Sequence, residues 1–422
     1  VKANPSLNII INNVDYDNVF VINAVLTGVN NAPLTGNVIV TVNGKQYTVN
    51  VVDGKGILVA DKLATGSYDF AANWAGNDNY NFAQDSGNFN VNKIASTIDV
   101  LVDDINVGED VTINVNVPVD ATGNVVISVN GEDYIASIVD GKATKIISNL
   151  KAGSYDVTVK YDGDNNYNGA SSAAKFVVSK VNPVIDVIAD NIVFGNDLTV
   201  NVVLSSDATG DVVITVNGKD YTVTIINGKA TQAISGLDAG DHNIVVKYSG
   251  DDKYNPVEFT KTVTVAKANP TLDVIIADID YNNVFIIDAT LTGVNNAKLS
   301  GDVIVTIGGK DYTVKVVDGK GTLSGIKLGA GSYAFSARFA GNDNYNSTSD
   351  SGDFKVNKIA STIGISVDDI QVGEDLTITV NVPSDAAGSV VVTVDGKDYT
   401  LAVVGGKATT TISGLKEGTY TI

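Results

Sequence analysis

The chain of 422 residues contains no cysteine and no methionine, and it has a single histidine and a single tryptophan. The lack of cysteine excludes disulfide bonds, thiol chemistry and the zinc sites that use cysteine ligands. Because an initiator methionine is also missing, we expect a processed chain or a segment of a longer one. No signal-peptide pattern is present, and no apolar run approaches the ~20 residues that a membrane-spanning helix needs. We therefore predict no membrane span within this segment.

Positive charge is scarce as well. The 48 acidic residues outnumber the 28 basic ones, which gives a formal net charge of −20. A nucleic-acid-binding protein needs clustered lysine and arginine side chains, so this class of partner is excluded. The acidic residues are spread through the turns, a distribution that favours solubility and mutual repulsion. With 7 prolines but 41 glycines, the composition favours many short strands joined by glycine turns over helices.

An internal repeat decides the architecture. DYDNVFVINAVLTGVNNA at 15–32 returns as DYNNVFIIDATLTGVNNA at 280–297, and the segment 92–113 returns at 357–378, so both copies begin 265 residues later. Near-identical junctions divide the chain further, at Asn92-Lys93, Ser179-Lys180, Ala266-Lys267 and Asn357-Lys358. We predict the end of a preceding repeat at 1–2, four complete repeats at 3–93, 94–180, 181–267 and 268–358, and a partial fifth repeat at 359–422. The fourth repeat resembles the first, and the fifth resembles the second.

The second repeat illustrates the pattern common to all of them. STIDVLV and DVTINVNV alternate apolar and polar residues, as half-buried strands do. The dipeptides Asn130-Gly131 and Asp140-Gly141 accept the positive φ angles of tight turns, so we predict two consecutive hairpins. A sixth strand, SYDVTVKY, and a last strand from about Ala173 to Ser179 close the repeat. Seven strands and no helix predict a sandwich of two antiparallel sheets.

Each repeat also carries Leu-x-x-Gly-x followed by a ring-bearing side chain. A tyrosine near the start of the sixth strand that bonds back to upstream backbone is a tyrosine corner. We predict structural corner positions at Tyr68, Tyr155, His242, Tyr333 and Tyr420. Because His242 stands where the other repeats have tyrosine, we interpret it as a corner residue rather than a general acid or base, which would need partners in reach.

These patterns resemble immunoglobulin-like and fibronectin-III-like sandwiches. Tyr-x-Gly-Asp-x-x-Tyr at 161–167, varied at 248–254, resembles the tandem immunoglobulin-like repeats of prokaryotic surface proteins. The cysteine-free, asparagine-rich composition is most similar to the adhesin-like proteins of methanogenic archaea. The resemblance covers all five repeats and implies a fold rather than a ligand. Because the junctions are short, we predict an all-β chain of tandem seven-stranded sandwiches in an extended rod.

No nucleophile–base pair, phosphate loop or basic patch is visible. We therefore predict no catalytic residue, no cofactor and no small-molecule substrate, and no enzymatic function. Calcium at a joint is an alternative, because acidic turns of neighbouring repeats are expected to face each other. The candidate ligands are Asp103, Asp104, Glu109 and Asp110 on one side and Asp207, Asp211, Asp251 and Asp252 on the other. Against it, no EF-hand spacing occurs, and solvated turns are often acidic.

Four further residues have both a structural and a functional interpretation. Trp74 aligns with Tyr161, Tyr248 and Phe339 on an inward face, so we predict core packing rather than sugar stacking. An isopeptide crosslink needs a lysine inside a core, whereas Lys160 and Lys247 fall on outward positions. Asn346 heads the one N-glycosylation sequon, which leaves glycosylation there as an alternative.

The first functional interpretation is structural: a segment of a long extracellular stalk or fibre on the cell surface that presents an adhesive region. One alternative is that the sandwiches themselves bind carbohydrate or protein. Another is a filament whose subunits complete one another by strand exchange. Partners would be other copies of the chain or other cell-surface proteins. Because Ile422 aligns with Val157, in mid-strand, we expect a window cut from a longer array, with a strand supplied by a partner chain as the alternative.

Overall fold

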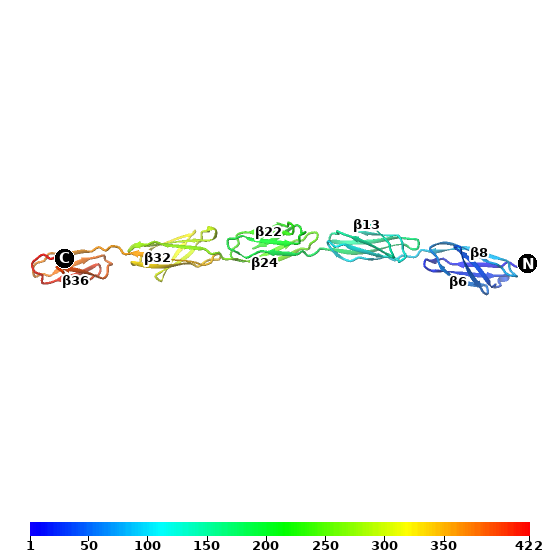
Figure 1. Ribbon diagram of the computed structural model, residues 1–422, viewed down its shortest axis with the longest axis horizontal. Coiled ribbons are helices and arrows are strands. Elements are labelled where there is room, and N and C mark those ends of the chain that lie inside the picture. The colour runs from blue at the N-terminus through cyan, green and yellow to red at the C-terminus, as the bar shows by residue number, and fades with distance from the viewer. The chain divides into compact units, whose positions relative to one another are not determined.

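The computed structural model describes all residues from 1 to 422, and strands make up most of the chain (Figure 1). The two 3-10 helices, η1 (Val29–Asn31) and η2 (Val294–Asn296), are single short turns. Neither has the length or the apolar character to cross a membrane. The chain divides into two compact units, Val1–Ile188 with Val200–Gln232 and Ile244–Lys261, and Ala189–Thr199 with Ala233–Asn243 and Thr262–Ile422.

Eight strands build the first repeat. They are β1 (Ser6–Ile11), β2 (Val14–Asp15), β3 (Val19–Thr27), β4 (Gly36–Val42), β5 (Lys45–Val51), β6 (Lys55–Lys62), β7 (Gly66–Trp74) and β8 (Ala83–Asn92). One sheet has the order β1-β3-β6 and the other β2-β8-β7-β4-β5. Side chains alternate between solvent and core along β1, because successive residues of a strand point to opposite faces. The two inner faces meet as the sandwich core.

The second and third repeats have the same arrangement. The second contains β9 (Asp99–Leu101), β10 (Ile105–Asn106), β11 (Val111–Asn116), β12 (Asn124–Val129), β13 (Glu132–Ser137), β14 (Lys142–Ile147), β15 (Gly153–Gly163) and β16 (Asn168–Ser179). The third contains β17 (Ile185–Ile188), β18 (Ile192–Val193), β19 (Leu198–Leu204), β20 (Asp211–Val216), β21 (Lys219–Thr224), β22 (Lys229–Ile234), β23 (Gly240–Tyr248) and β24 (Val257–Ala266). Their sheets have the orders β14-β11-β9 and β10-β16-β15-β12-β13, and β17-β19-β22 and β18-β24-β23-β20-β21.

The fourth repeat continues the pattern, and the fifth contains part of it. The fourth contains β25 (Thr271–Ile276), β26 (Ile279–Asp280), β27 (Phe285–Thr292), β28 (Gly301–Ile307), β29 (Lys310–Val316), β30 (Lys320–Ile326), β31 (Gly331–Phe339) and β32 (Thr348–Asn357). The fifth contains β33 (Gly364–Val367), β34 (Leu376–Asn381), β35 (Ser389–Val394), β36 (Lys397–Ala402) and β37 (Lys407–Ile412). The sheets are β25-β27-β30 with β26-β32-β31-β28-β29, and β33-β34-β37 with the pair β35-β36. The repeat boundaries given above stay predictions.

Two details of the second repeat differ from the sequence-based prediction. A short strand that was not predicted, β10, lies between the first two predicted strands and pairs in parallel with the last strand, Ile105 lying opposite Val178. The turn at Asp140 does not close a hairpin, because β13 and β14 belong to different sheets and a single bridge, Val139 to Lys142, joins their ends. The turn itself has the expected geometry, since φ is 50° at Asp140 and 71° at Gly141.

The core of each complete repeat is apolar and aromatic. In the second repeat, Ile113, Val125 and Val157 have no exposed surface, and Tyr161 and Phe176 are each 1% exposed. Trp74 is buried in the first repeat, which confirms the prediction of core packing. Each fully buried side chain of this size contributes about 1.5–3 kcal/mol by leaving water, so these residues hold the two sheets together.

Candidate functional site

The five corner side chains make the same hydrogen bond. Each ring bonds to the backbone carbonyl oxygen four residues upstream: Tyr68 to Ala64 at 2.8 Å, Tyr155 to Lys151 at 3.0 Å, His242 Nε2 to Asp238 at 2.8 Å, Tyr333 to Gly329 at 2.9 Å and Tyr420 to Lys416 at 2.9 Å. In addition, Tyr155 stacks on Phe176 with ring centroids 5.1 Å apart. Apart from tyrosines, His242 is the only polar or charged side chain among the buried residues, so no lysine lies inside a core. Lys160 and Lys247 are exposed and form ion pairs with Asp162 and Glu258.

Replacing Tyr155 with phenylalanine is expected to lower the free energy of unfolding of the second repeat by about 1 kcal/mol, because one hydrogen bond is lost while the ring keeps its stacking. Chemical denaturation followed by hydrogen exchange of peptides from 153–179 measures this. The control is the same change at Tyr221 in the third repeat, whose ring lies under Lys219 and whose hydroxyl makes no hydrogen bond. It is expected to change the free energy of unfolding of the third repeat by less than about 0.5 kcal/mol. Equal effects at both positions would contradict a stabilising role for the corner bond.

The joints between complete repeats consist of one lysine residue. At the first joint, Asn92 accepts a hydrogen bond from the backbone N–H of Tyr16 at 2.8 Å within the first repeat. Ile94 donates its backbone N–H to Asn166 at 3.1 Å within the second repeat. Only Lys93 lies between these two fixed residues. Lys180 and Lys267 occupy the same place in the next two joints, since Ser179, Val181, Ala266 and Ala268 make the equivalent bonds.

Side chains reinforce each of these joints. The Nζ atoms of Lys93 and Lys267 donate to the carbonyl oxygens of Asp164 and Asn342 at 2.5 Å, and Lys180 bonds to Asp251 in the same way. In each complete repeat an asparagine of the last turn donates its Nδ2 to the carbonyl of the residue before the repeat: Asn81 to Lys2, Asn168 to Lys93, Asn255 to Lys180 and Asn346 to Lys267, at 3.2–3.5 Å. Both the linking residue and the turn beside it are therefore fixed.

This arrangement bears on the glycosylation alternative at Asn346. Its Nδ2 donates to Lys267 at 3.3 Å and to Asn269 Oδ1 at 2.8 Å, which uses both amide hydrogens. A glycan attached to this nitrogen would replace one of them. Modification of Asn346 would therefore remove a hydrogen bond at the joint.

A carboxylate at the first joint binds tyrosines from two repeats. Asp120 of the second repeat accepts a hydrogen bond from the hydroxyl of Tyr16 at 2.9 Å and from that of Tyr167 at 2.6 Å. The rings of Tyr16 and Tyr167 meet edge to face, with centroids 5.8 Å apart. The hydrogen bonds from Tyr167 and Tyr16 lower the pKa of Asp120 below its ordinary value. The same contact recurs 265 residues later, where Tyr281 donates to Asp385 at 2.7 Å.

The other two joints differ at the position of Tyr16. Phe194 stands there in the third repeat and meets Tyr345 of the fourth edge to face at 5.3 Å. A Cβ atom on the adjacent Gly195 would lie 2.5 Å from a methyl group of Val294, so a larger residue there would displace this side chain. Val107 stands at the same position in the second repeat, and an exposed ion pair, Lys151–Asp252 at 3.7 Å, joins this repeat to the third. The contacts between neighbouring repeats thus range from a carboxylate that binds tyrosines of two repeats, Asp120, to a weak ion pair on the surface, Lys151–Asp252.

No group of three or more histidine, aspartate or glutamate side chains lies close enough to hold a metal ion. Several of the acids considered for calcium bind backbone N–H groups instead. Asp104 accepts from Val177 at 2.6 Å, and Glu109 accepts from Asn106 at 2.7 Å. The sequence places these acids in turns, where carboxylates commonly cap free N–H groups.

Asp164 caps the turn that contacts Lys93. Its carboxylate accepts hydrogen bonds from the backbone N–H groups of Thr122 at 2.8 Å, Asn166 at 2.8 Å and Tyr167 at 2.9 Å. Partial burial acts to raise the pKa of Asp164, but these hydrogen bonds outweigh it and lower the pKa from 3.8 to about 2. The charged carboxylate is therefore the form that stabilises the fold.

This pKa sets a pH dependence for the second repeat. Because the pKa of Asp164 is lower in the folded chain than in the unfolded chain, its contribution is complete above about pH 4 and is lost as the pH falls through 2. We expect Asp164→Asn to destabilise this repeat at neutral pH and to flatten its acid transition between pH 4 and pH 2. Pulsed cleavage by pepsin, which is active in this range, measures the transition. Asp162→Asn, at an exposed neighbouring residue, is the control and should leave the transition in place.

A separate surface distinguishes the first repeat. The amide face is the outer face of its five-stranded sheet, where eight exposed amide side chains stand on neighbouring strands: Asn37, Gln46, Asn50, Asn73, Gln84, Asn88, Asn90 and Asn92. Six of their counterparts 265 residues later are charged, namely Asp302, Asp311, Lys315, Arg338, Asp353 and Lys355, while Gln84 and Asn92 correspond to Ser349 and Asn357. Asn124 is the one amide at these positions in the second and third repeats. Sequence reasoning missed this face because its members are scattered along the chain.

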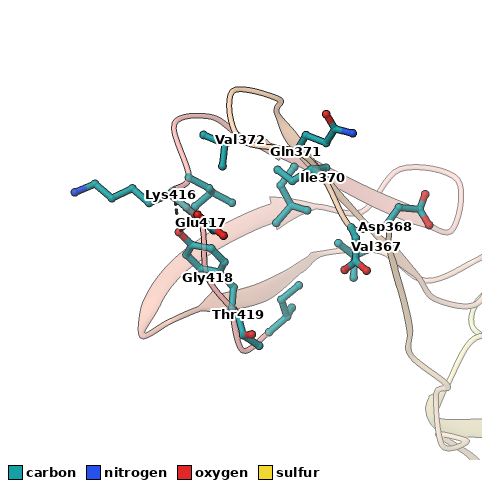
Figure 2. Close-up of a pocket in the computed structure, with 14 residues that line it drawn as sticks. Val367, Asp368, Ile370, Gln371, Val372, Lys416, Glu417, Gly418 and Thr419 are labelled. Carbon is teal, nitrogen blue, oxygen red and sulfur yellow. Dashed lines mark hydrogen bonds between the residues drawn. The ribbon is translucent and has the colours of Figure 1, made fainter.

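The fifth repeat contains a cavity of about 370 Å³. Figure 2 shows it between the segments 367–372 and 416–419. In the four preceding repeats the segment equivalent to 370–371 pairs in parallel with the last strand, as β10 does with β16.

Comparison with known proteins agrees with this architecture. Residues 102–179 and 188–271 match the family described as Bacterial Ig-like domain (group 3). The chain is a series of tandem immunoglobulin-like β-sandwiches. No curated protein matches its sequence. Domains of this kind are typically non-catalytic structural modules.

Solved structures with detectable similarity share little sequence with this chain. Fibronectin(III)-like modules of CbhA from Clostridium thermocellum are 19% identical, over 42% of this chain and 94% of theirs, with a TM-score of 0.20. Immunoglobulin domains 1–5 of Sidekick-1 are 13% identical, over 98% of this chain and 94% of theirs, with a TM-score of 0.27. Three immunoglobulin domains of titin are 15% identical, over 63% of this chain and 99% of theirs, with a TM-score of 0.27.

Proposed function

We propose that this chain is a structural segment of an extracellular stalk or fibre on the cell surface, which spaces an adhesive region from the cell. The observation that carries the proposal is the joint of one lysine, held by backbone hydrogen bonds on both sides, as at Lys93. A linker with so few free dihedral angles gives neighbouring repeats little independent motion. The net charge of −20 keeps such chains apart and in solution.

The proposal includes the absence of enzymatic activity. His242 is buried and bound to the backbone of Asp238 in the place that tyrosine takes elsewhere. A general acid or base needs an accessible reacting atom. We expect the substitution His242→Tyr to change the stability of the third repeat and to leave the function of the chain unchanged.

The origin and the partners belong to the same proposal. The repeat composition resembles adhesin-like surface proteins of methanogenic archaea, whereas the matching family is described as bacterial. We propose an archaeal surface protein whose partners are other copies of the chain or other surface proteins.

Location on intact cells tests the proposal. Antibodies raised against this chain should label unbroken cells in immunoelectron microscopy, with gold particles outside the envelope. A protease added to intact cells should remove the label. Label confined to the cytoplasm, or label that appears only after lysis, would contradict an extracellular role.

A further inference from the structure

The amide face has side chains free to bind something else. Asn37, Asn50 and Asn73 are exposed, and none of them forms a hydrogen bond or ion pair through its side chain. Each amide offers two donors and one acceptor oxygen. A surface with so many unengaged donors and acceptors is equipped for a polar ligand.

The fold does not require amides at these positions. In the first repeat Asn37 lies opposite Asn50 across β4 and β5, and in the fourth repeat Asp302 lies opposite Lys315 across β28 and β29. The register is the same, yet the fourth repeat forms an ion pair of 3.1 Å where the first has two amides. The backbone therefore accommodates either the amide pair or the ion pair. The two repeats differ here only in the chemistry of their surface.

The sheet register shows how the amides surround a shallow floor. Thr41, Ala71 and Ser86 are opposite one another on β4, β7 and β8, which makes a row of small side chains across three strands. Gln46 ends this row on the edge strand β5. Asn73 lies opposite Gln84 on one side of the row, and Asn88 lies opposite Asp69 on the other. Strands are ~4.8 Å apart, so the amides and the floor form one continuous surface.

The charge of this surface limits the class of ligand. Asp69 is the one charged side chain among the outward positions of β4, β7 and the paired part of β8. Covering a charged side chain costs far more than covering an amide, so a face with many amides and a single charge, Asp69 opposite Asn88, suits a ligand without charges. Hydroxyl groups donate and accept hydrogen bonds, as amides do. We propose that the amide face of the first repeat binds a neutral polysaccharide.

A second copy of the chain fits this face less well. Each copy carries −20, so pairing two chains face to face is opposed by electrostatic repulsion. A neutral polysaccharide brings no charge. Binding of this kind goes beyond the spacer role proposed above and does not depend on it.

The test uses the full chain and two exchange variants. Isothermal titration measures binding to soluble neutral polysaccharides, namely mannan, dextran and hydroxyethyl cellulose, with polygalacturonate as the charged comparison. The variant Asn37→Asp, Asn50→Lys, Asn73→Arg gives the first repeat the side chains of the fourth, which the same fold already tolerates. We expect binding of at least one neutral polysaccharide and roughly tenfold or greater weakening in this variant. The reverse variant Asp302→Asn, Asp311→Gln, Lys315→Asn, Arg338→Asn, Asp353→Asn, Lys355→Asn removes all six charges and should add a second binding face and raise the stoichiometry.

Other outcomes would overturn the proposal. They are an absence of binding to all three neutral polysaccharides, equal binding by the parent chain and the first variant, and preferential binding of polygalacturonate. Dimerisation in light scattering that the first variant abolishes would show instead that the face pairs copies of the chain. Circular dichroism of both variants establishes that the sandwiches remain folded.

Discussion

Replacing Phe176 with alanine is expected to lower the free energy of unfolding of the second repeat by about 3–5 kcal/mol. Phe176 is 1% exposed in β16, and the corner residue Tyr155 rests on its ring. Removing the ring leaves a cavity, because the surrounding strands relax only in part. Since small domains are stable by about 5–15 kcal/mol, this change brings the second repeat close to unfolding.

Hydrogen exchange measured on peptides from 153–179 separates the second repeat from the others. Val177→Ala is the matched control, because Val177 is the next residue of the same strand and points outward, 42% exposed. It should change stability by less than about 0.5 kcal/mol. An equal loss of stability in Phe176→Ala and Val177→Ala would contradict the assignment of Phe176 to the core and of Val177 to the outer face.

Replacing Gly163 with alanine is expected to destabilise the second repeat by more than about 2 kcal/mol. Its φ is +87°, a conformation that L-residues rarely adopt, and an added Cβ would lie 2.5 Å from the carbonyl oxygen of Tyr167. Both the backbone conformation and the tight turn would have to change. The turn also holds Asp164 and the contact with Lys93, so the joint should loosen with it.

Gly131 provides a control with the same backbone angle. Its φ is also +87°, but nothing lies within 4 Å of the Cβ that a substitution would add. Gly131→Ala should therefore cost only the conformational part, about 1–2 kcal/mol. Thermal unfolding of the two variants gives the difference, and a smaller loss at Gly163 than at Gly131 would contradict the packing described for this turn.

The sequence predicted the features that have a period or a fixed spacing. Alternation of apolar residues gave the strands around Ile113 and Val157, and the turn dipeptides gave the positive φ angles at Asn130 and Asp140. The same reasoning could not find β10, because two residues carry no period. It also took the turn at Asp140 for a hairpin, since local turn chemistry does not tell which sheet the next strand joins.

Contacts between residues that are far apart in the sequence were harder to predict. Acidic turns were expected to face each other at the joints, but the hydrogen bonds of their carboxylates could not be predicted: Asp104 and Glu109 accept from backbone N–H groups, and Asp120 accepts from tyrosine hydroxyls. The amide face was invisible for a similar reason. Asn37 and Asn73 are 36 positions apart in the sequence, and only the pairing of β4 with β7 brings their strands together. Aligning the first and fourth repeats at alternate strand positions would have revealed it.

The distribution of distances across the first joint tests the central claim most directly. Because the chain has no cysteine, Thr48→Cys and Ser137→Cys, both exposed, allow exactly two spin labels to be placed, one in each repeat. Double electron–electron resonance should give one narrow distribution of distances. Inserting Gly-Ser-Gly-Ser between Lys93 and Ile94 should broaden it, because the inserted residues separate the two hydrogen-bonded ends. A broad distribution in the parent chain, or one that the insertion leaves unchanged, would show that the one-lysine joint does not restrain the repeats.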